Sequence, residues 1–201
     1  YAIIEEIVYY SVSYVVDGAA YGEAVKYEEN TTYTVITDEP AKTGYTFAGW
    51  TPEVPATMPA EDKTFTATWT VNNYTVTWDV DGKTTTDTVA YGAAVNAPAD
   101  PEKEGHTFTG WEGYEEGMVM PAEDLTISAT WTANEYDIVF VGNGGYFNDD
   151  KADTEETVKA TFNEDFAEPT PVRSGYAFIG WATDAAATAG NKDLGILTTD
   201  A

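Results

Sequence analysis

The sequence contains no cysteine, one histidine (His106) and one arginine (Arg173) among its 201 residues. Without cysteine, disulfide bonds cannot hold the fold together. Histidine, cysteine and arginine are also the side chains that enzymes often use as general base, nucleophile and clamp for developing negative charge. We therefore expect a protein that is not an enzyme and has no catalytic residue.

Positive charge and long apolar runs are scarce as well. The chain has 9 lysines and arginines against 35 aspartates and glutamates, which gives a formal net charge of -26 at pH 7. A chain this acidic repels the phosphates of nucleic acids. No stretch approaches the roughly 18 to 20 consecutive apolar residues that a membrane-spanning helix needs. Nucleic-acid binding and membrane insertion are therefore not expected.

The chain nevertheless carries enough apolar surface to fold. Hydrophobic residues make up 43% of the sequence and aromatic residues 14%, including 6 tryptophans and 14 tyrosines. Disordered acidic segments are poor in such residues, because they cannot bury enough apolar surface to offset the loss of chain entropy. A folded protein is therefore expected.

Two sequence motifs recur along the chain. A seven-residue motif, Gly-Tyr/His-x-Phe-x-Gly-Trp, occurs at residues 44–50, 105–111 and 175–181, and we call it the GW motif. A second motif, Met-Pro-Ala-Glu-Asp, occurs at residues 58–62 and 120–124. Recurrence at a fixed period is the signature of a repeat protein. The sequence predicts three tandem repeats, at residues 1–71, 72–133 and 134–201.

The negative charge is spread over all three predicted repeats. The first has 3 basic and 11 acidic residues, the second 2 and 11, and the third 4 and 13. An even distribution favours a solvated surface that keeps copies apart, with an acidic recognition patch as the alternative. Short linkers at 70–72 and 132–134 leave neighbouring repeats little slack, so we expect a monomer with its repeats in an extended array.

Within a repeat the hydrophobic pattern has a period of two. In the stretch 74–80, Tyr, Val, Trp and Val alternate with Thr and Asp, which is typical of a strand with one buried face. Asp17-Gly18, Asp81-Gly82 and Gly144-Gly145 predict hairpin turns. The proline-containing stretch 97–104 allows at most one short helix. Mainly β repeats are therefore expected.

Together these motifs resemble the Listeria-Bacteroides repeat family, which includes the B repeats of internalin B. The resemblance covers nearly all of residues 10–201. It implies small α+β, β-grasp-like modules in secreted or wall-attached bacterial surface proteins, where they act as spacers or adhesive units. The third repeat is expected to be incomplete, because it lacks a closing Ala-x-Trp strand, and the chain is expected to be a segment of a longer protein.

The resemblance also implies roles for individual residues. Gly49, Gly110 and Gly180 correspond to the tight glycine of the family. Aromatic side chains correspond to its structural core: Trp50, Trp111, Trp181, Phe47, Phe108, Phe178, Trp69 and Trp131.

Candidate binding residues are few. His106 occupies the position of a tyrosine in the other two GW motifs, so we interpret it as a structural ring. The densest group of oxygen ligands is Asp149, Asp150, Asp153 and Glu155, which could hold calcium. This run lacks the glycine and terminal glutamate of an EF-hand loop, and Lys151 lies within it. No cofactor or metal is expected, with calcium at this run as the alternative.

Two functional hypotheses remain from the sequence. The leading one is a non-enzymatic spacer or adhesive stalk at the bacterial cell surface or in the cell wall. The alternative is a module that binds a glycan or a host-surface protein through its aromatic side chains. A specific site would use residues confined to one repeat, such as 112–117 with Tyr114, or 148–156.

Overall fold

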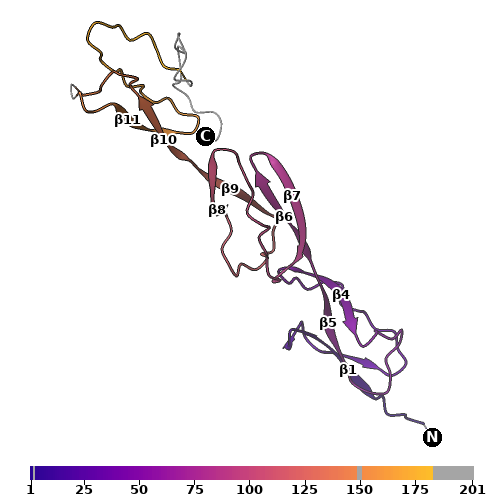
Figure 1. Ribbon diagram of the computed structural model, residues 1–201. Coiled ribbons are helices and arrows are strands. Elements are labelled where there is room, and N and C mark those ends of the chain that lie inside the picture. The colour runs from indigo at the N-terminus through magenta and orange to yellow at the C-terminus, as the bar shows by residue number, and fades with distance from the viewer. Residues whose placement is uncertain (2, 149–150, 183–201) are drawn as a thin grey trace. The chain divides into compact units, whose positions relative to one another are not determined.

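The computed structural model describes residues 1, 3–148 and 151–182, and its regular elements are all β-strands (Figure 1). The mainly β class is confirmed, and no helix occurs in the described residues, including the proline-containing stretch 97–104. The strands are β1 (Tyr9–Val16), β2 (Ala19–Ala20), β3 (Val25–Glu28), β4 (Tyr45–Thr51), β5 (Lys63–Val71), β6 (Asn73–Val80), β7 (Lys83–Ala90), β8 (His106–Glu112), β9 (Leu125–Ala133), β10 (Glu135–Val141) and β11 (Glu155–Thr161).

The first sheet has the strand order β2-β1-β5-β4, with β3 also paired to β1. Its two central strands, β1 and β5, run parallel, and each has an antiparallel partner on its outer side. A parallel pair cannot be joined by a tight turn. A long crossover, which includes β4, therefore connects β1 to β5, and a β-grasp-like repeat is built in this way without a helix.

The second sheet has the equivalent order β7-β6-β9-β8, and the third has the antiparallel pair β10-β11. The expected gap in the third repeat, where a closing strand should be, lies outside the described residues. By its internal contacts the chain divides into two compact units. The first comprises Tyr1–Trp78, Thr84–Ala97 and Glu115–Thr126, and the second comprises Asp79–Lys83, Pro98–Tyr114 and Ile127–Ala201.

The predicted hairpin turns are present in the first two repeats. Asp17 and Gly18 have φ of 49° and 85°, and Asp81 and Gly82 have φ of 52° and 86°. Positive φ at both central residues is the geometry of a type I′ turn, which matches the twist of the strands it joins. In the third repeat the prediction of a hairpin turn at Gly144-Gly145 was wrong, because the longer segment 142–154 joins β10 to β11. The positive φ values fall on Asn143 and Gly144, since asparagine tolerates this conformation, and Gly145 is instead packed in the loop.

The residues that fill the core come from corresponding places in the repeats. Tyr14, Trp78 and Phe140 share one position in the first strand of each repeat, and all three are buried. The prediction of a buried face along these strands is confirmed. The core of the first repeat is Val12, Tyr14, Tyr33, Met58 and Phe65.

Candidate functional site

The GW motifs form the edge strands β4 and β8 in the first two repeats. Each strand contains a bulge where the pairing register shifts, between Phe47 and Gly49 in β4 and between Phe108 and Gly110 in β8. Gly49 has φ of 120° and Gly110 of 137°, values that side chains other than glycine rarely adopt. The second glycine of the motif is therefore the residue that lets the strand bulge.

The aromatic residues of the motif lie less deeply than a core assignment implies. Trp181 is buried, and its Nε1 donates a hydrogen bond to the Pro169 carbonyl at 3.0 Å. Phe178 is 42% exposed, so its assignment to the core was wrong. Phe178 lies in a segment, residues 172–179, that is exposed throughout and belongs to no described strand, so its ring is covered only in part, by Trp181. The other six residues that were expected in the core are half-buried: Trp50, Trp111, Phe47 and Phe108 of the motif, and Trp69 and Trp131 of the neighbouring strands β5 and β9.

These half-buried rings contact one another in the same way in two repeats. The Phe47 ring lies edge-on to Trp50 and Trp69, with centroids 5.2 and 5.8 Å away. In the second repeat Phe108 lies 5.4 Å from Trp111 and 5.5 Å from Trp131. Such edge-to-face pairs stabilise a fold beyond the area they bury. In each repeat the three rings form an aromatic ladder across the outer strand pair, β4–β5 or β8–β9. Each Phe ring in the ladder packs against the two Trp rings beside it.

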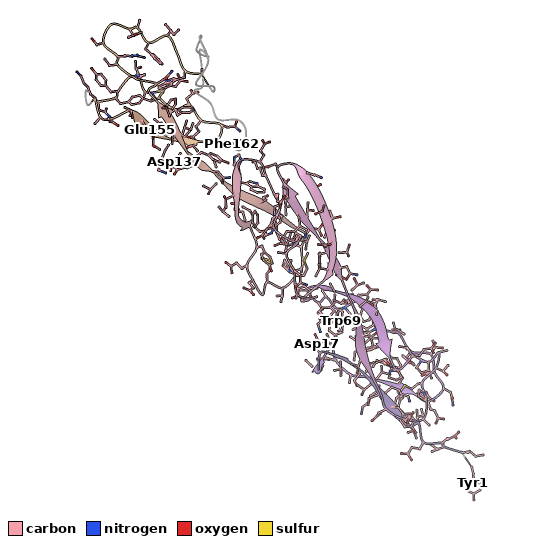
Figure 2. All side chains as sticks on the ribbon, viewed as in Figure 1. Tyr1, Asp17, Trp69, Asp137, Glu155 and Phe162 are labelled. Carbon is pink, nitrogen blue, oxygen red and sulfur yellow. The ribbon has the colours of Figure 1, made fainter. Side chains whose placement is uncertain are left out.

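A lysine covers the end of each ladder. Lys42 Nζ binds Asp17 Oδ1 at 2.8 Å and lies 5.5 Å from the Trp69 ring centroid, and Figure 2 labels both of these partners. Lys103 repeats the arrangement, with Asp81 at 3.0 Å and the Trp131 ring at 5.4 Å. The lysine thus ties the hairpin turn to the ladder through an ion pair and a cation–π contact.

In the third repeat Arg173 occupies the position of Lys42 and Lys103, two residues before the first glycine of the GW motif. Its guanidinium carbon lies 4.2 Å from the Tyr176 ring centroid, and its Nη1 donates to the Asn143 carbonyl at 3.3 Å. The chain's arginine therefore packs within its own repeat.

The Met-Pro-Ala-Glu-Asp motif supplies a core side chain and a strand cap. Met58 and Met120 are almost completely buried. Asp62 Oδ1 accepts the Ser11 backbone N–H at 2.7 Å, and Asp124 accepts that of Thr75 at the same distance. The Ser11 N–H holds the pKa of Asp62 below its ordinary value, because the bond favours the charged carboxylate. This motif was identified from the sequence but was assigned no role. Its recurrence at equivalent places in two repeats was the signal that its residues have a structural role.

The remaining candidate residues do not converge on a site. His106 Nδ1 lies 2.8 Å from the Glu104 carbonyl oxygen, and its ring packs edge-on against Phe162. Asp149 and Asp150 of the candidate calcium run lie outside the described residues, and Asp153 Oδ2 accepts a hydrogen bond from Asn148 Nδ2. Within the described part of the chain, no group of three or more acidic or histidine side chains is placed to hold a metal ion.

The second repeat contains a small hollow. It has a volume of about 240 Å³ and is lined by Val76, Trp78, Asp87, Val89 and Val95 among others. Its carboxylate is already engaged, since Asp87 Oδ2 accepts the Trp78 Nε1–H at 2.9 Å. Ligand pockets combine a larger volume with several convergent polar groups. The hollow therefore offers no arrangement for acid–base chemistry.

Tyr114, the aromatic residue confined to one repeat, is half-buried.

Comparisons with known proteins assign the repeats to a family. Residues 10–72, 74–130 and 136–199 each match the Listeria-Bacteroides repeat domain, and no enzyme family is involved in this match. Internalin H of Listeria monocytogenes is 42% identical over 113 residues, which cover 48% of this chain and 21% of that protein. Two proteins of Evansella cellulosilytica, whose names call them membrane proteins, are 31% and 32% identical over 89% of this chain and over 29% and 22% of their own lengths.

The chain thus spans less than a third of the length of these relatives. No helix in the described residues is long and apolar enough to cross a membrane. Among solved structures, domains 3-4 of the Streptococcal High Identity Repeats in Tandem from a cell surface protein match 62% of this chain and 98% of that chain. The identity is 16% and the TM-score 0.27, too low to carry an argument. The family match covers all three repeats, and the chain therefore belongs to the Listeria-Bacteroides repeat family.

Proposed function

We propose that this chain is a non-enzymatic spacer in a bacterial cell-surface protein, where it holds another domain away from the cell wall. Repeats of this family occur in bacterial cell-surface proteins. The proposal places the chain outside the cell, at the surface or in the wall, as a monomer.

One observation carries the proposal: in the first two repeats, the recurring methionines, aspartates and GW-motif aromatic residues are engaged in structure. The recurring methionines fill cores, and the recurring aspartates cap strands. The GW motif supplies a bulge and an aromatic ladder. A spacer needs only such residues, whereas an enzyme needs ionisable groups that meet in a cleft.

The spacer proposal is tested by displaying the chain on bacteria between a wall anchor and an epitope tag. We expect antibody binding to the tag to fall when residues 72–133 are deleted, because one repeat of reach is lost. Inserting a second copy of residues 72–133 into the parent chain should raise antibody binding to the tag above the level of the parent chain. Substitution of a single side chain within a repeat, such as the half-buried Tyr114 to alanine (Tyr114→Ala), should leave tag accessibility unchanged, since it alters no length.

The alternative, a glycan- or host-protein-binding module, predicts a different outcome of the same experiment. Bacteria displaying the chain would bind immobilised glycans or host-surface proteins, and Tyr114→Ala would reduce that binding. Tag accessibility that is independent of repeat number, together with such binding, would replace the spacer proposal with this one.

A further inference from the structure

Each boundary between repeats is built around a glycine that touches an aromatic ring of the following repeat. The glycines are Gly44 and Gly105, the first residues of their GW motifs, and both are buried. A Cβ added to Gly44 would lie 2.2 Å from the ring of Tyr91, and a Cβ on Gly105 would lie 2.2 Å from the ring of Phe162. Real side-chain carbons do not approach ring atoms so closely. Only glycine leaves room for the ring at these positions.

The same two boundaries share a backbone relay through one asparagine. The Asn72 N–H donates to the Gly44 carbonyl at 2.9 Å, and the Asn72 carbonyl accepts the Tyr91 N–H at 2.9 Å. At the second boundary, Asn134 binds Gly105 and Phe162 in the same manner at 2.8 and 2.9 Å. The linker residue is therefore bonded through its backbone to both the preceding and the following repeat.

Side chains complete each boundary. Thr46 Oγ1 donates to Asn72 Oδ1 at 2.6 Å, and Thr107 Oγ1 donates to Asn134 Oδ1 at 2.7 Å. The second residue of the first and second GW motifs lies edge-on to the incoming ring, with centroids 5.7 Å apart for Tyr45 and Tyr91. His106 and Phe162 lie 5.4 Å apart. This contact gives His106 a structural reason for standing in a tyrosine position, and Figure 2 labels Phe162 at this boundary.

We infer that the first glycine of the GW motif is a socket, and that it receives an aromatic plug from the next repeat so that neighbouring repeats are coupled. Each boundary lies wholly within one of the two compact units. The inference does not depend on the spacer function, because repeats can be coupled whatever they do. The socket is an interaction surface of the repeat, and the partner that fits it is a repeat with an aromatic plug.

The plug residue differs between repeats, which makes the coupling selective. Tyr91 and Phe162 each precede a residue with positive φ, Gly92 at 73° and Asn163 at 59°. In the first repeat the corresponding residue is Asn30, which has φ of 62°. Its N–H donates to the Met58 carbonyl just as that of Gly92 donates to the Met120 carbonyl. The first repeat therefore has Glu29 in the plug position. A carboxylate does not fit a socket made of a glycine and an aromatic ring, because it would lose its hydration there.

The third GW motif offers a matched control within the same chain. Gly175 has φ of 82°, close to the 66° of Gly105, but a Cβ on Gly175 meets nothing within 4 Å. The backbone strain of a glycine-to-alanine change is therefore similar at both positions. Only the change at Gly105 also drives a side-chain carbon into a plug.

The test is amide hydrogen exchange on the full chain, followed at the N–H groups of Asn134 and Phe162. We expect both amides to be protected in the parent chain. Gly105→Ala should lower their protection at least about tenfold, whereas Gly175→Ala should leave it unchanged. Phe162→Glu should act like Gly105→Ala, and Phe162→Tyr should retain protection because Tyr91 is the plug of the other boundary.

A second comparison separates the plug from strain. In a chain that already carries Phe162→Ala, adding Gly105→Ala should lower protection at these amides much less than it does in the parent chain, because the ring is gone and only the backbone strain remains. The inference is overturned if Gly105→Ala and Gly175→Ala have equal effects on the Asn134 and Phe162 amides. It is also overturned if those amides exchange freely in the parent chain.

Discussion

Met120→Ala should be among the most destabilising substitutions in the second repeat. The Met120 side chain is 1% exposed. Its N–H donates to the Ala93 carbonyl at 2.9 Å and its carbonyl accepts the Gly92 N–H at 2.9 Å, so the backbone is held on both sides. A pinned backbone cannot close over the space that the side chain leaves. Truncating a buried methionine to alanine costs about 2 to 5 kcal/mol, and we expect about 3 kcal/mol or more here.

The assay is urea unfolding of the full chain, followed by NMR signals of β8 and β9 so that the second repeat is observed separately. Val119→Ala is the matched control, since Val119 is the adjacent residue and is 57% exposed. It should change the free energy of unfolding by less than about 0.5 kcal/mol. A loss below about 1 kcal/mol for Met120→Ala, or equal losses for the two variants, would refute the assignment of this motif to the core.

Three further predictions concern individual side chains. Because the Ser11 N–H lowers the pKa of Asp62, the stability it provides should be complete above the ordinary value of 3.8 and lost as the pH falls through the lower folded value. Asp62→Asn should therefore flatten the acid limb of a urea-midpoint profile, and an unchanged limb would contradict this. Burial raises the pKa of Tyr33. Its hydroxyl is buried without a hydrogen-bond partner among the described residues, so Tyr33→Phe should not lower the urea midpoint at pH 7. It should also remove part of the loss of stability above pH 10, and a clear loss at pH 7 would mean that the hydroxyl has a partner. The Lys103–Asp81 pair is partly exposed, so a double-mutant cycle should give a coupling of about 1 kcal/mol or less that weakens with salt, and a larger, salt-insensitive value would contradict a surface pair.

Much of the fold could be predicted because equivalent positions in different repeats carry similar residues, so a pattern seen in one repeat can be checked in another. The alternation in 74–80 identified a strand with a buried face, and the structure places Trp78 in the core as expected. The Asp-Gly turns were predictable because positive φ leaves few choices of residue. The hairpin turn predicted at Gly144-Gly145 was wrong because a glycine pair does not show whether the partner strand follows directly, and here that strand begins only at Glu155.

The depth of the aromatic residues was not predictable in the same way. An aromatic residue in an edge strand can be covered by another ring instead of by a core, as Phe47 is by Trp50 and Trp69. The sequence pattern is the same in both cases. The sockets at Gly44 and Gly105 were also missed, because each depends on a contact with a residue far along the chain, Tyr91 or Phe162.

Small-angle scattering of the 201-residue chain, in low and in high salt, tests the spacer proposal most directly. A compact globule of this length has a maximum dimension of roughly 50 to 60 Å. Three repeats with radii of gyration of about 11 Å each should exceed roughly 80 Å when they do not pack side by side. Because short bonded linkers act alongside charge repulsion, the account predicts a maximum dimension above roughly 80 Å in low salt that shrinks only modestly in high salt. A globular profile at both salt concentrations would contradict it.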